Sequence, residues 1–262
     1  MIFKLFHTQL SQGLAACAIA AVIALLVVLL ARRRGVEMMG ELPLAQLRGI
    51  LQIVAVGLIL AYLLHGSQWI AVPVLGAMMV AAAAIVRDRA RMIPRAFTLA
   101  LLSILVGAGI IVAVTILTGV VPLRLAILIP VGSMLVAQTM NMQSLFLDRL
   151  RDDILAHIGE VESALALGAS PQTAAMPYIS AAFRASLIPS VDNIRSLGIV
   201  WIPGLMAGMV LSGSSPVYAA LYQFVVLSII FSAAALTCFT ASYLVMGRIF
   251  SPEEQLLLRP ER

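Results

Sequence analysis

The chain has 262 residues, of which 62% are apolar and 11% charged, and its mean hydropathy is +1.06. Because soluble domains carry about 25% charged residues, this composition excludes a soluble globular protein. The net charge of +5 comes from short basic clusters between long uncharged runs, a pattern of membrane topology and not of a nucleic-acid-binding surface. The single lysine, Lys4, also excludes a phosphate-binding loop of the G-x-x-x-x-G-K-[ST] type.

Seven apolar segments approach or exceed the length of a membrane-crossing helix, which is about 20 residues. In chain order they cover residues 12–31, 49–64, 69–86, 97–118, 125–147, 197–213 and 217–246. The first is followed by Arg32, Arg33 and Arg34, a stop-transfer flank that predicts a retained helix and not a cleaved secretory signal. We therefore predict an all-α polytopic membrane protein, in which residues 1–262 form a single transmembrane domain with about seven transmembrane helices.

The basic residues predict the orientation of these helices. Only Lys4 and Arg124 fall on one side of the membrane, whereas every other arginine and all 12 acidic residues fall on the opposite side. The positive-inside rule assigns the basic side to the cytoplasm. We expect the N-terminus outside and the C-terminus in the cytoplasm, in a multi-pass protein of the cell (inner) membrane that is surrounded by the lipid bilayer.

The largest segment outside the predicted spans covers residues 148–195, on the cytoplasmic side. Its first part predicts an amphipathic helix over residues 152–167, because apolar residues recur there at spacings of three and four. These residues are Ile154, Ile158, Val161 and Leu165. Gly168 fits the C-terminal stop of this helix.

A second cytoplasmic helix is predicted over residues 171–186. Ser170 fits its N-cap and Pro171 its first position. The helix is expected to end at Ile188-Pro189, because proline disfavours a helical conformation at the preceding residue. The two helices form a hairpin with a tight turn near the membrane surface, and a soluble partner must dock mainly on this hairpin.

The fifth and sixth predicted spans contain helix-breaking and polar residues. Proline bends a helix, and in lipid the carbonyl that it frees needs another partner, so these spans are expected to line a pathway or an interface. The candidate residues are Pro130, Met134, Gln138, Asn141, Asp192, Asn193, Pro203, Gly204, Met206 and Gly208. An alternative for Gly204, Gly208 and Ser212, which recur every four residues, is a ridge for close helix packing.

The methionine, charged and histidine side chains of the chain do not decide what kind of site the spans form. Methionine thioethers could receive a transition metal in passage, although methionine is more often a flexible core filler. Asp192, Asn193 and Arg195 could pair locally or form a gate at the cytoplasmic mouth of the sixth span. No Asp or Glu lies well inside any predicted span, which disfavours a transporter coupled to protons or ions. The three histidines lie on different segments, so no metal ligands are assigned.

Three stretches of the chain carry a family resemblance. The hairpin sequence EVESALALGASPQTAA looks like the E-A-A-x-x-x-G coupling loop of ABC permeases, with Ser163 in place of the first alanine. The runs RASLIPSVDNIRSLGIVWIPGLMAGMVLSG and LRGILQIVAVGLIL are more specific. Together they resemble the FetB family of iron-export ABC permeases, which includes plant permeases linked to aluminium tolerance, over residues 40–250. The pair Ile188-Pro189 comes later than in the importer form of the loop.

The resemblance implies an ABC permease subunit that exports iron or another metal and is not itself an enzyme. ATP and Mg²⁺ would be bound by a separate cytoplasmic ATPase subunit, so no catalytic residue and no cofactor are expected in this chain. The residues implied to couple to that ATPase are Glu160, Glu162, Ala164, Gly168, Ala169, Ser170 and Pro171. Permeases of this class are expected to work as pairs, with Gly204 and Gly208 as a candidate dimer contact.

Other functions are weighed against metal export. An ABC permease for a non-metal substrate stays open, because nothing in the spans forms a recognisable metal cage. A membrane scaffold that recruits a cytoplasmic partner without transporting a substrate also stays open. A standalone intramembrane enzyme is least favoured, because the spans lack paired polar catalytic groups.

Overall fold

The computed structural model describes residues 9–33, 42–63 and 67–258. Within these ranges every regular element is a helix, which confirms the prediction of an all-α chain. The chain divides into two compact units, Met1–Gly66 and Ser67–Arg262, and a single domain stays a prediction. Several residues of the orientation prediction, namely Lys4, Arg34, Arg259 and Arg262, lie outside the described residues.

The first unit contains two apolar helices, α1 (Gln9–Arg32) and α2 (Leu42–Leu63). The stretch Ser11–Leu30 of α1 is long and apolar enough to cross a membrane, and α2 carries a shorter apolar stretch, Leu44–Ile59. The helix predicted over 49–64 begins earlier than expected. Its start at Leu42 places Pro43 in the first turn, where the missing backbone N–H costs little.

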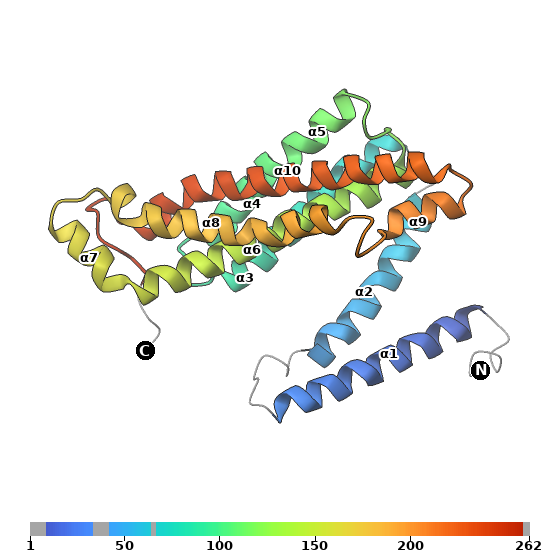
Figure 1. Ribbon diagram of the computed structural model, residues 1–262, viewed down its shortest axis with the longest axis horizontal. Helices are drawn as coiled ribbons and strands as arrows, with labels where there is room; N and C mark the ends of the chain where they lie inside the picture. The colour runs from blue at the N-terminus through green and yellow to red at the C-terminus, as the bar shows by residue number, and fades with distance from the viewer. Residues whose placement is uncertain (1–8, 34–41, 64–66, 259–262) are drawn as a thin grey trace. The chain divides into compact units, whose positions relative to one another are not determined.

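The second unit is a bundle of long helices that run side by side (Figure 1). In chain order its elements are η3 (Gln68–Ile70), α3 (Ala71–Arg89), α4 (Ala96–Ile104), the π-helix η4 (Leu105–Gly109), α5 (Ile110–Leu117), α6 (Leu125–Ala156), α7 (Ile158–Ala166), α8 (Pro171–Ser196), α9 (Gly204–Leu211) and α10 (Pro216–Ile249). With α1, the described residues contain 5 helical stretches long and apolar enough to cross a membrane, which supports a polytopic membrane protein.

Helix α6 lies at the centre of this bundle and packs against α3, α8 and α10. Its inward face buries Phe146, Leu147 and Leu150 almost completely. The helix continues past Pro130, one turn after its start, so this proline does not end it. A Cβ atom at Gly132 would lie 2.6 Å from the side chain of Leu75 in α3, so glycine allows the close approach of these two helices.

The predicted span 97–118 is continuous but changes its winding in the middle. Between α4 and α5 the chain forms the five-residue π-helix η4, which packs against α10. At its centre Gly107 is buried, and a Cβ atom there would lie 2.6 Å from the backbone nitrogen of Thr237 and 2.7 Å from the carbonyl oxygen of Ala233. The wide turn and the glycine therefore let two helices approach each other closely.

The single helix predicted over 197–213 is wrong. Only Gly204–Leu211 is helical, and 8 residues span about 12 Å, too short for a bilayer. Residues 197–203 form a turn in which Leu197 pairs with Trp201 as an isolated bridge. Apolar composition predicted a helix here, whereas Gly198, with φ of +76°, and Pro203, the N-cap of α9, interrupt it.

The predicted end of the second cytoplasmic helix at Ile188-Pro189 is also wrong. Helix α8 runs on to Ser196 and contains both Pro177 and Pro189. An interior proline costs about 3 kcal/mol because it removes one hydrogen bond and crowds the preceding turn. Packing of α8 against α6 and α10 outweighs this local cost.

The amphipathic helix predicted over 152–167 is divided in two. Helix α6 extends through Ile154, which is fully buried, and ends at Ala156. His157 then breaks the helix, with its backbone N–H shared between the carbonyls of Asp153 and Ile154, and α7 follows. The apolar period is correct, but the break changes the direction of the chain.

Candidate functional site

The first candidate site is the elbow, defined as α7, the turn 167–170 and the first turn of α8. At the turn, Gly168 has φ of +89°, a conformation that only glycine adopts without strain. Its N–H donates to the carbonyl of Leu165 at 3.0 Å, and the N–H of Ala169 donates to that of Ala164 at 3.0 Å. This pair of bonds is the Schellman motif, so the predicted stop at Gly168 is confirmed.

Helix α8 begins immediately after this turn. The backbone N–H of Thr173 donates to the Ser170 hydroxyl at 3.2 Å, and Pro171 follows at the first helical position. A serine cap of this kind stabilises a helix by about 1 kcal/mol. The predicted N-cap is confirmed, and the elbow is a stiff connection between two capped helices.

A second set of contacts ties α7 to the side of α8. The Tyr178 hydroxyl donates to Glu160 Oε2 at 3.0 Å, and the rings of Tyr178 and His157 stack with centroids 5.3 Å apart. Partial burial, and then the bond to the Glu160 carboxylate, raise the pKa of Tyr178. Val161, which is 1% exposed, fixes the inner face of α7 in the core. These contacts hold α7 against α8.

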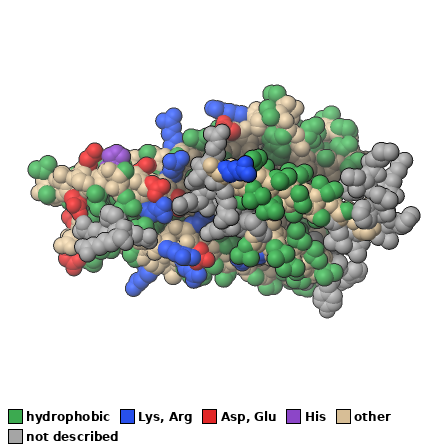
Figure 2. Space-filling view, turned by 90° about the horizontal axis from the view of Figure 1, so that it is seen from below, with side chains coloured by type: hydrophobic (Ala, Val, Ile, Leu, Met, Phe, Trp, Pro, Cys, Tyr) green, Lys and Arg blue, Asp and Glu red, His purple; other side chains and the backbone are tan. Residues whose placement is uncertain are grey.

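The predicted coupling residues divide between the inner and outer faces of the elbow. Glu160, Glu162, Gly168 and Ser170 are exposed, whereas Ala164 and Ala169 are half-buried and Pro171 is buried. Leu167, which the sequence did not single out, is 89% exposed at the tip. Figure 2 shows acidic side chains gathered at the α7 end of the molecule. A soluble partner would meet an apolar tip flanked by carboxylates.

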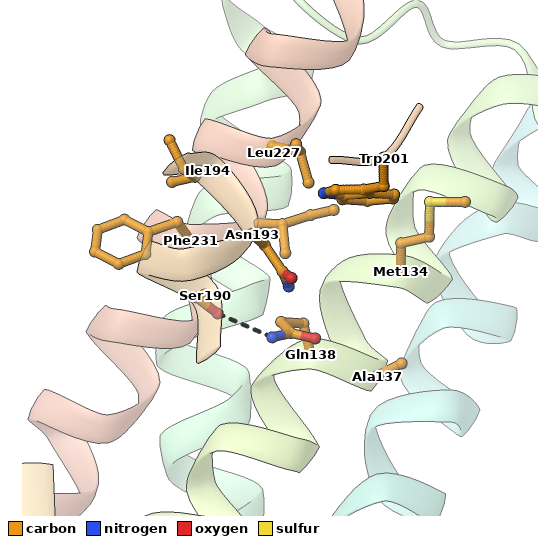
Figure 3. A pocket seen from close by; sticks show the side chains of 10 residues that line it. Met134, Ala137, Gln138, Ser190, Asn193, Ile194, Trp201, Leu227 and Phe231 are labelled. Atoms are coloured by element: carbon orange, nitrogen blue, oxygen red, sulfur yellow. Dashed lines mark hydrogen bonds between the residues drawn. The ribbon is translucent and has the colours of Figure 1, made fainter. Parts of the chain in front are cut away.

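The second candidate site is the mid-helix pocket, a cavity of about 290 Å³ between α6, α8, α10 and the turn 197–203 (Figure 3). Its lining residues are Met134, Ala137, Gln138, Ser190, Asn193, Ile194, Trp201, Leu227, Ile230 and Phe231. Helix α8 supplies the polar side chains opposite Gln138. Since α8 also begins at the elbow, one continuous helix of 26 residues joins the two sites.

A short chain of hydrogen bonds organises the polar wall of the pocket. Gln138 Nε2 donates to Ser190 Oγ at 2.9 Å, and the Ser190 hydroxyl donates to Met142 Sδ at 3.1 Å. The amides of Gln138 and Asn193 point into the same space, and the ring of Trp201 covers one side of it (Figure 3). The pocket therefore offers two amides inside a largely apolar wall.

The structure brings together only some of the predicted pathway residues. Met134, Gln138 and Asn193 share the pocket, whereas Asn141 is exposed elsewhere on α6. Asp192 lies 4.0 Å from Arg195, both exposed, as a local pair. The remaining residues, Pro130, Pro203, Gly204, Met206 and Gly208, lie outside the pocket lining.

Sequence reasoning missed Ser190, Trp201 and the α10 side of the pocket. Ser190 lies 52 residues from its partner Gln138, so no local spacing connects them. Trp201 was placed on a helix, whereas it lies in the turn. Across the part of the chain that the structure describes, no group of three or more His, Cys, Asp or Glu side chains could hold a metal ion.

Comparison with known proteins assigns the chain to a family. The family described as "Uncharacterised protein family (UPF0014)" matches residues 14–250, nearly the whole chain. The chain belongs to the UPF0014 family. The resemblance found in the sequence is thereby confirmed, since relatives of this UPF0014 chain include a protein named as a probable iron export permease.

Three relatives illustrate the similarity of this UPF0014 protein. It is 34% identical to "Protein ALUMINUM SENSITIVE 3" of Arabidopsis thaliana, over 94% of this chain and 90% of the relative. It is 32% identical to "UPF0014 membrane protein STAR2" of Oryza sativa subsp. japonica, over 91% and 84%. It is 28% identical to "Probable iron export permease protein FetB" of Escherichia coli (strain K12), over 92% and 93%. No solved structure is significantly similar to it.

Proposed function

We propose that this chain is the permease subunit of an ABC-type transporter, which exports iron or another metal and is driven by a separate ATPase subunit. Similarity to a relative named as a probable iron export permease supports the substrate and the direction. The observation that carries the coupling is the continuity of α8, which begins at the elbow and ends beside the mid-helix pocket.

The elbow is suited to receive mechanical work from the ATPase. Its turn is fixed by the bonds of Gly168, and its two helices are joined by the pair Tyr178 and Glu160. From Ser170 to Ser190 the rise of an α-helix amounts to about 30 Å. A displacement of the elbow therefore moves Ser190 and Asn193 relative to Gln138 on α6, which would open or close the pocket.

The proposed topology keeps seven crossings with the elbow in the cytoplasm. Helix α1, the apolar part of α2, α3, the unit from α4 to α5, α6 and α10 each make one crossing. The sixth crossing in chain order consists of two pieces, the C-terminal end of α8 and the whole of α9, which the turn 197–203 joins. Broken helices occur at membrane depth in transporters where they line a cavity, as this turn does through Trp201.

We also propose that two copies pair through this broken crossing. None of the residues of α9 is buried, and a Cβ atom at Gly204 or Gly208 would meet nothing within 4 Å. In the turn, Ile199 and Val200 are 87% and 79% exposed. Irregular backbone cannot face lipid, so another protein surface must cover it. Small residues four apart suit close packing against a second copy.

The scaffold alternative accounts for the elbow but not for the pocket. A recruiting protein needs only a docking surface, whereas this chain also carries two amides in a pocket between α6, α8 and α10. The pocket also has a direct helical connection to the docking surface. This arrangement favours transport over recruitment.

The docking assignment is tested by replacing Gly168 with valine. A β-branched residue at φ of +89° is strained, so the turn must change shape and we expect loss of ATPase pull-down and of stimulated ATP hydrolysis. The matched control is Gly76→Val, a helical glycine of α3 with no atom within 4 Å of a Cβ atom. Unchanged pull-down and stimulation in correctly inserted Gly168→Val protein would make the docking assignment wrong.

A further inference from the structure

We propose that the mid-helix pocket receives its metal as a complex of low net charge with organic ligands, and not as a bare or hydrated cation. This inference rests on the proposed export function, because it names the chemical form of that cargo. Three properties of the pocket carry it: its charge, its size and the state of its sulfur and oxygen atoms.

All of the side chains that line the pocket are uncharged. A divalent or trivalent cation that leaves water loses many kcal/mol of solvation, and only opposite charge or several strong ligands can offset this loss. Asp192 does not line the pocket, and its exposed carboxylate lies 4.0 Å from the Arg195 guanidinium. The pocket therefore matches a metal whose charge is already neutralised by ligands that travel with it.

The size of the pocket leads to the same conclusion. Protein oxygen atoms bind metal ions at roughly 2.0–2.6 Å. A cavity of about 290 Å³ is far larger than the space inside such a ligand shell. A bare ion could contact one wall only, whereas a metal surrounded by small organic ligands would fill the space.

The donor atoms are better arranged to bind an organic ligand than a metal ion. Met142, a residue that is 2% exposed, has its sulfur engaged by the Ser190 hydroxyl. Among the lining residues Met134 alone carries a thioether, and a single soft donor cannot replace the ligand shell of a metal ion. The amides of Gln138 and Asn193 can each donate and accept hydrogen bonds. The remaining wall, which includes Trp201 and Phe231, offers apolar contact to the carbon atoms of a ligand.

The tryptophans allow binding to be measured without the ATPase. The chain has two, Trp69 in η3 and Trp201 in the pocket wall. In the variant Trp69→Phe, fluorescence reports Trp201 alone. We would titrate this purified full-length variant, in lipid nanodiscs, with gallium(III) tris(acetohydroxamate). In this neutral complex three singly charged hydroxamates balance Ga³⁺, and gallium neither changes oxidation state nor quenches as iron does.

The neutral complex is expected to produce a saturable change in Trp201 fluorescence. Zn²⁺, a spectroscopically silent hydrated cation, and free acetohydroxamic acid are expected to produce none at the same concentrations. A saturable response to Zn²⁺ but not to the complex would overturn the proposal, and so would no response to any of the three. An equal response to the free acid would show a site for organic solutes and would also overturn it.

Variants of the amides that line the pocket test whether the complex binds there. A variant of the Trp69→Phe chain that carries both Gln138→Ala and Asn193→Ala lacks both amides of the pocket. It should bind the complex roughly tenfold or more weakly, because each hydrogen bond contributes on the order of 1 kcal/mol. The matched control Ser180→Ala removes an exposed polar group from the same helix, α8, outside both the pocket and the elbow, and should leave the affinity unchanged. Equal affinity in the double variant and the control would overturn the assignment to this pocket.

A charge-inserting variant tests the electrostatic step directly. Asn193→Asp places a carboxylate in the pocket, so it should create a response to Zn²⁺ and weaken the response to the neutral complex. Because these titrations omit the ATPase, the two proposals can fail separately. A permease that binds the complex but stimulates no ATPase contradicts the proposed function, and one that stimulates the ATPase but binds only hydrated cations contradicts this inference.

Discussion

Two four-residue turns show how single residues direct this chain. Residues 168–171 and 213–216 each contain a glycine at positive φ, a serine that caps the next helix and a proline at its first position. At Gly213 the N–H groups of Gly213 and Ser214 donate to Val210 and Met209, as in the Schellman motif at Gly168. One turn connects α7 to α8 and the other connects α9 to α10, so the same local chemistry reverses the chain twice.

At the same scale, Tyr178→Phe tests the tie between α7 and α8. Loss of the 3.0 Å hydrogen bond to Glu160 should raise hydrogen exchange of the α7 amides by up to about fivefold, the equivalent of about 1 kcal/mol. The control Glu160→Gln keeps an acceptor for the Tyr178 hydroxyl and should change exchange less. Equal exchange in wild type and Tyr178→Phe would show that this bond does not hold the elbow.

The raised pKa of Tyr178 gives this tie a pH dependence with a defined sign. Burial and the Glu160 carboxylate favour the protonated phenol in the folded protein. The stabilisation is therefore complete below the ordinary tyrosine pKa of about 10 and is lost as the pH rises through the higher folded value. The bond is intact throughout the physiological range.

At the scale of elements, the proposed sixth crossing differs most from an ordinary transmembrane helix. Helix α8 is the more polar piece and reaches the pocket from the elbow, whereas α9 is short and apolar. The turn between them exposes apolar side chains and lines the pocket with Trp201. Because Trp201 lies in this turn and lines the pocket, the break in the helix supplies part of the pocket wall.

Cysteine crosslinking tests the pairing of two copies through α9. In a chain without Cys17 and Cys238, Gly208→Cys should form a disulfide-linked dimer on mild oxidation, because this position is exposed and its Cβ atom would meet nothing within 4 Å. Leu205→Cys, at a half-buried position of the same helix, serves as the control and should crosslink less. Crosslinks confined to another helix, such as α1, would contradict the proposed contact.

At the scale of the whole molecule, the proposed function requires that the elbow and the far end of α9 lie on opposite sides of the membrane. The central helix α6 has 32 residues, and its length of about 48 Å exceeds a hydrocarbon core of about 30 Å. In the proposed topology, its end near α7 extends beyond the membrane. This extension would carry the elbow to a soluble ATPase while the pocket stays within the bilayer.

Single-cysteine labelling checks this topology. In the same cysteine-free chain, Ser212→Cys at the exposed end of α9 should react with a membrane-impermeant thiol reagent added to intact cells. Ser163→Cys, exposed on α7, should react only after the cells are permeabilised. Labelling of Ser163→Cys in intact cells would place the elbow outside and end the proposed coupling to a cytoplasmic ATPase.

Local chemistry was predictable from the sequence because neighbouring residues decide it. Gly168 as a helix stop, Ser170 as an N-cap and the apolar face of α7 depend on φ preferences, side-chain acceptors and helical periodicity within a few residues. Apolar composition likewise predicted the 5 helical stretches of the described residues that are long and apolar enough to cross a membrane. These features require no knowledge of which helix packs against which.

Only the tertiary structure decided where α8 ends and what it meets. Packing against α6 and α10 carries the helix through Pro189, although the proline alone disfavours that conformation. The same packing brings Ser190 to Gln138 across 52 residues of chain. Contact energies between distant segments can exceed local conformational preferences by several kcal/mol in total, and no local pattern in the amino-acid sequence records those contacts.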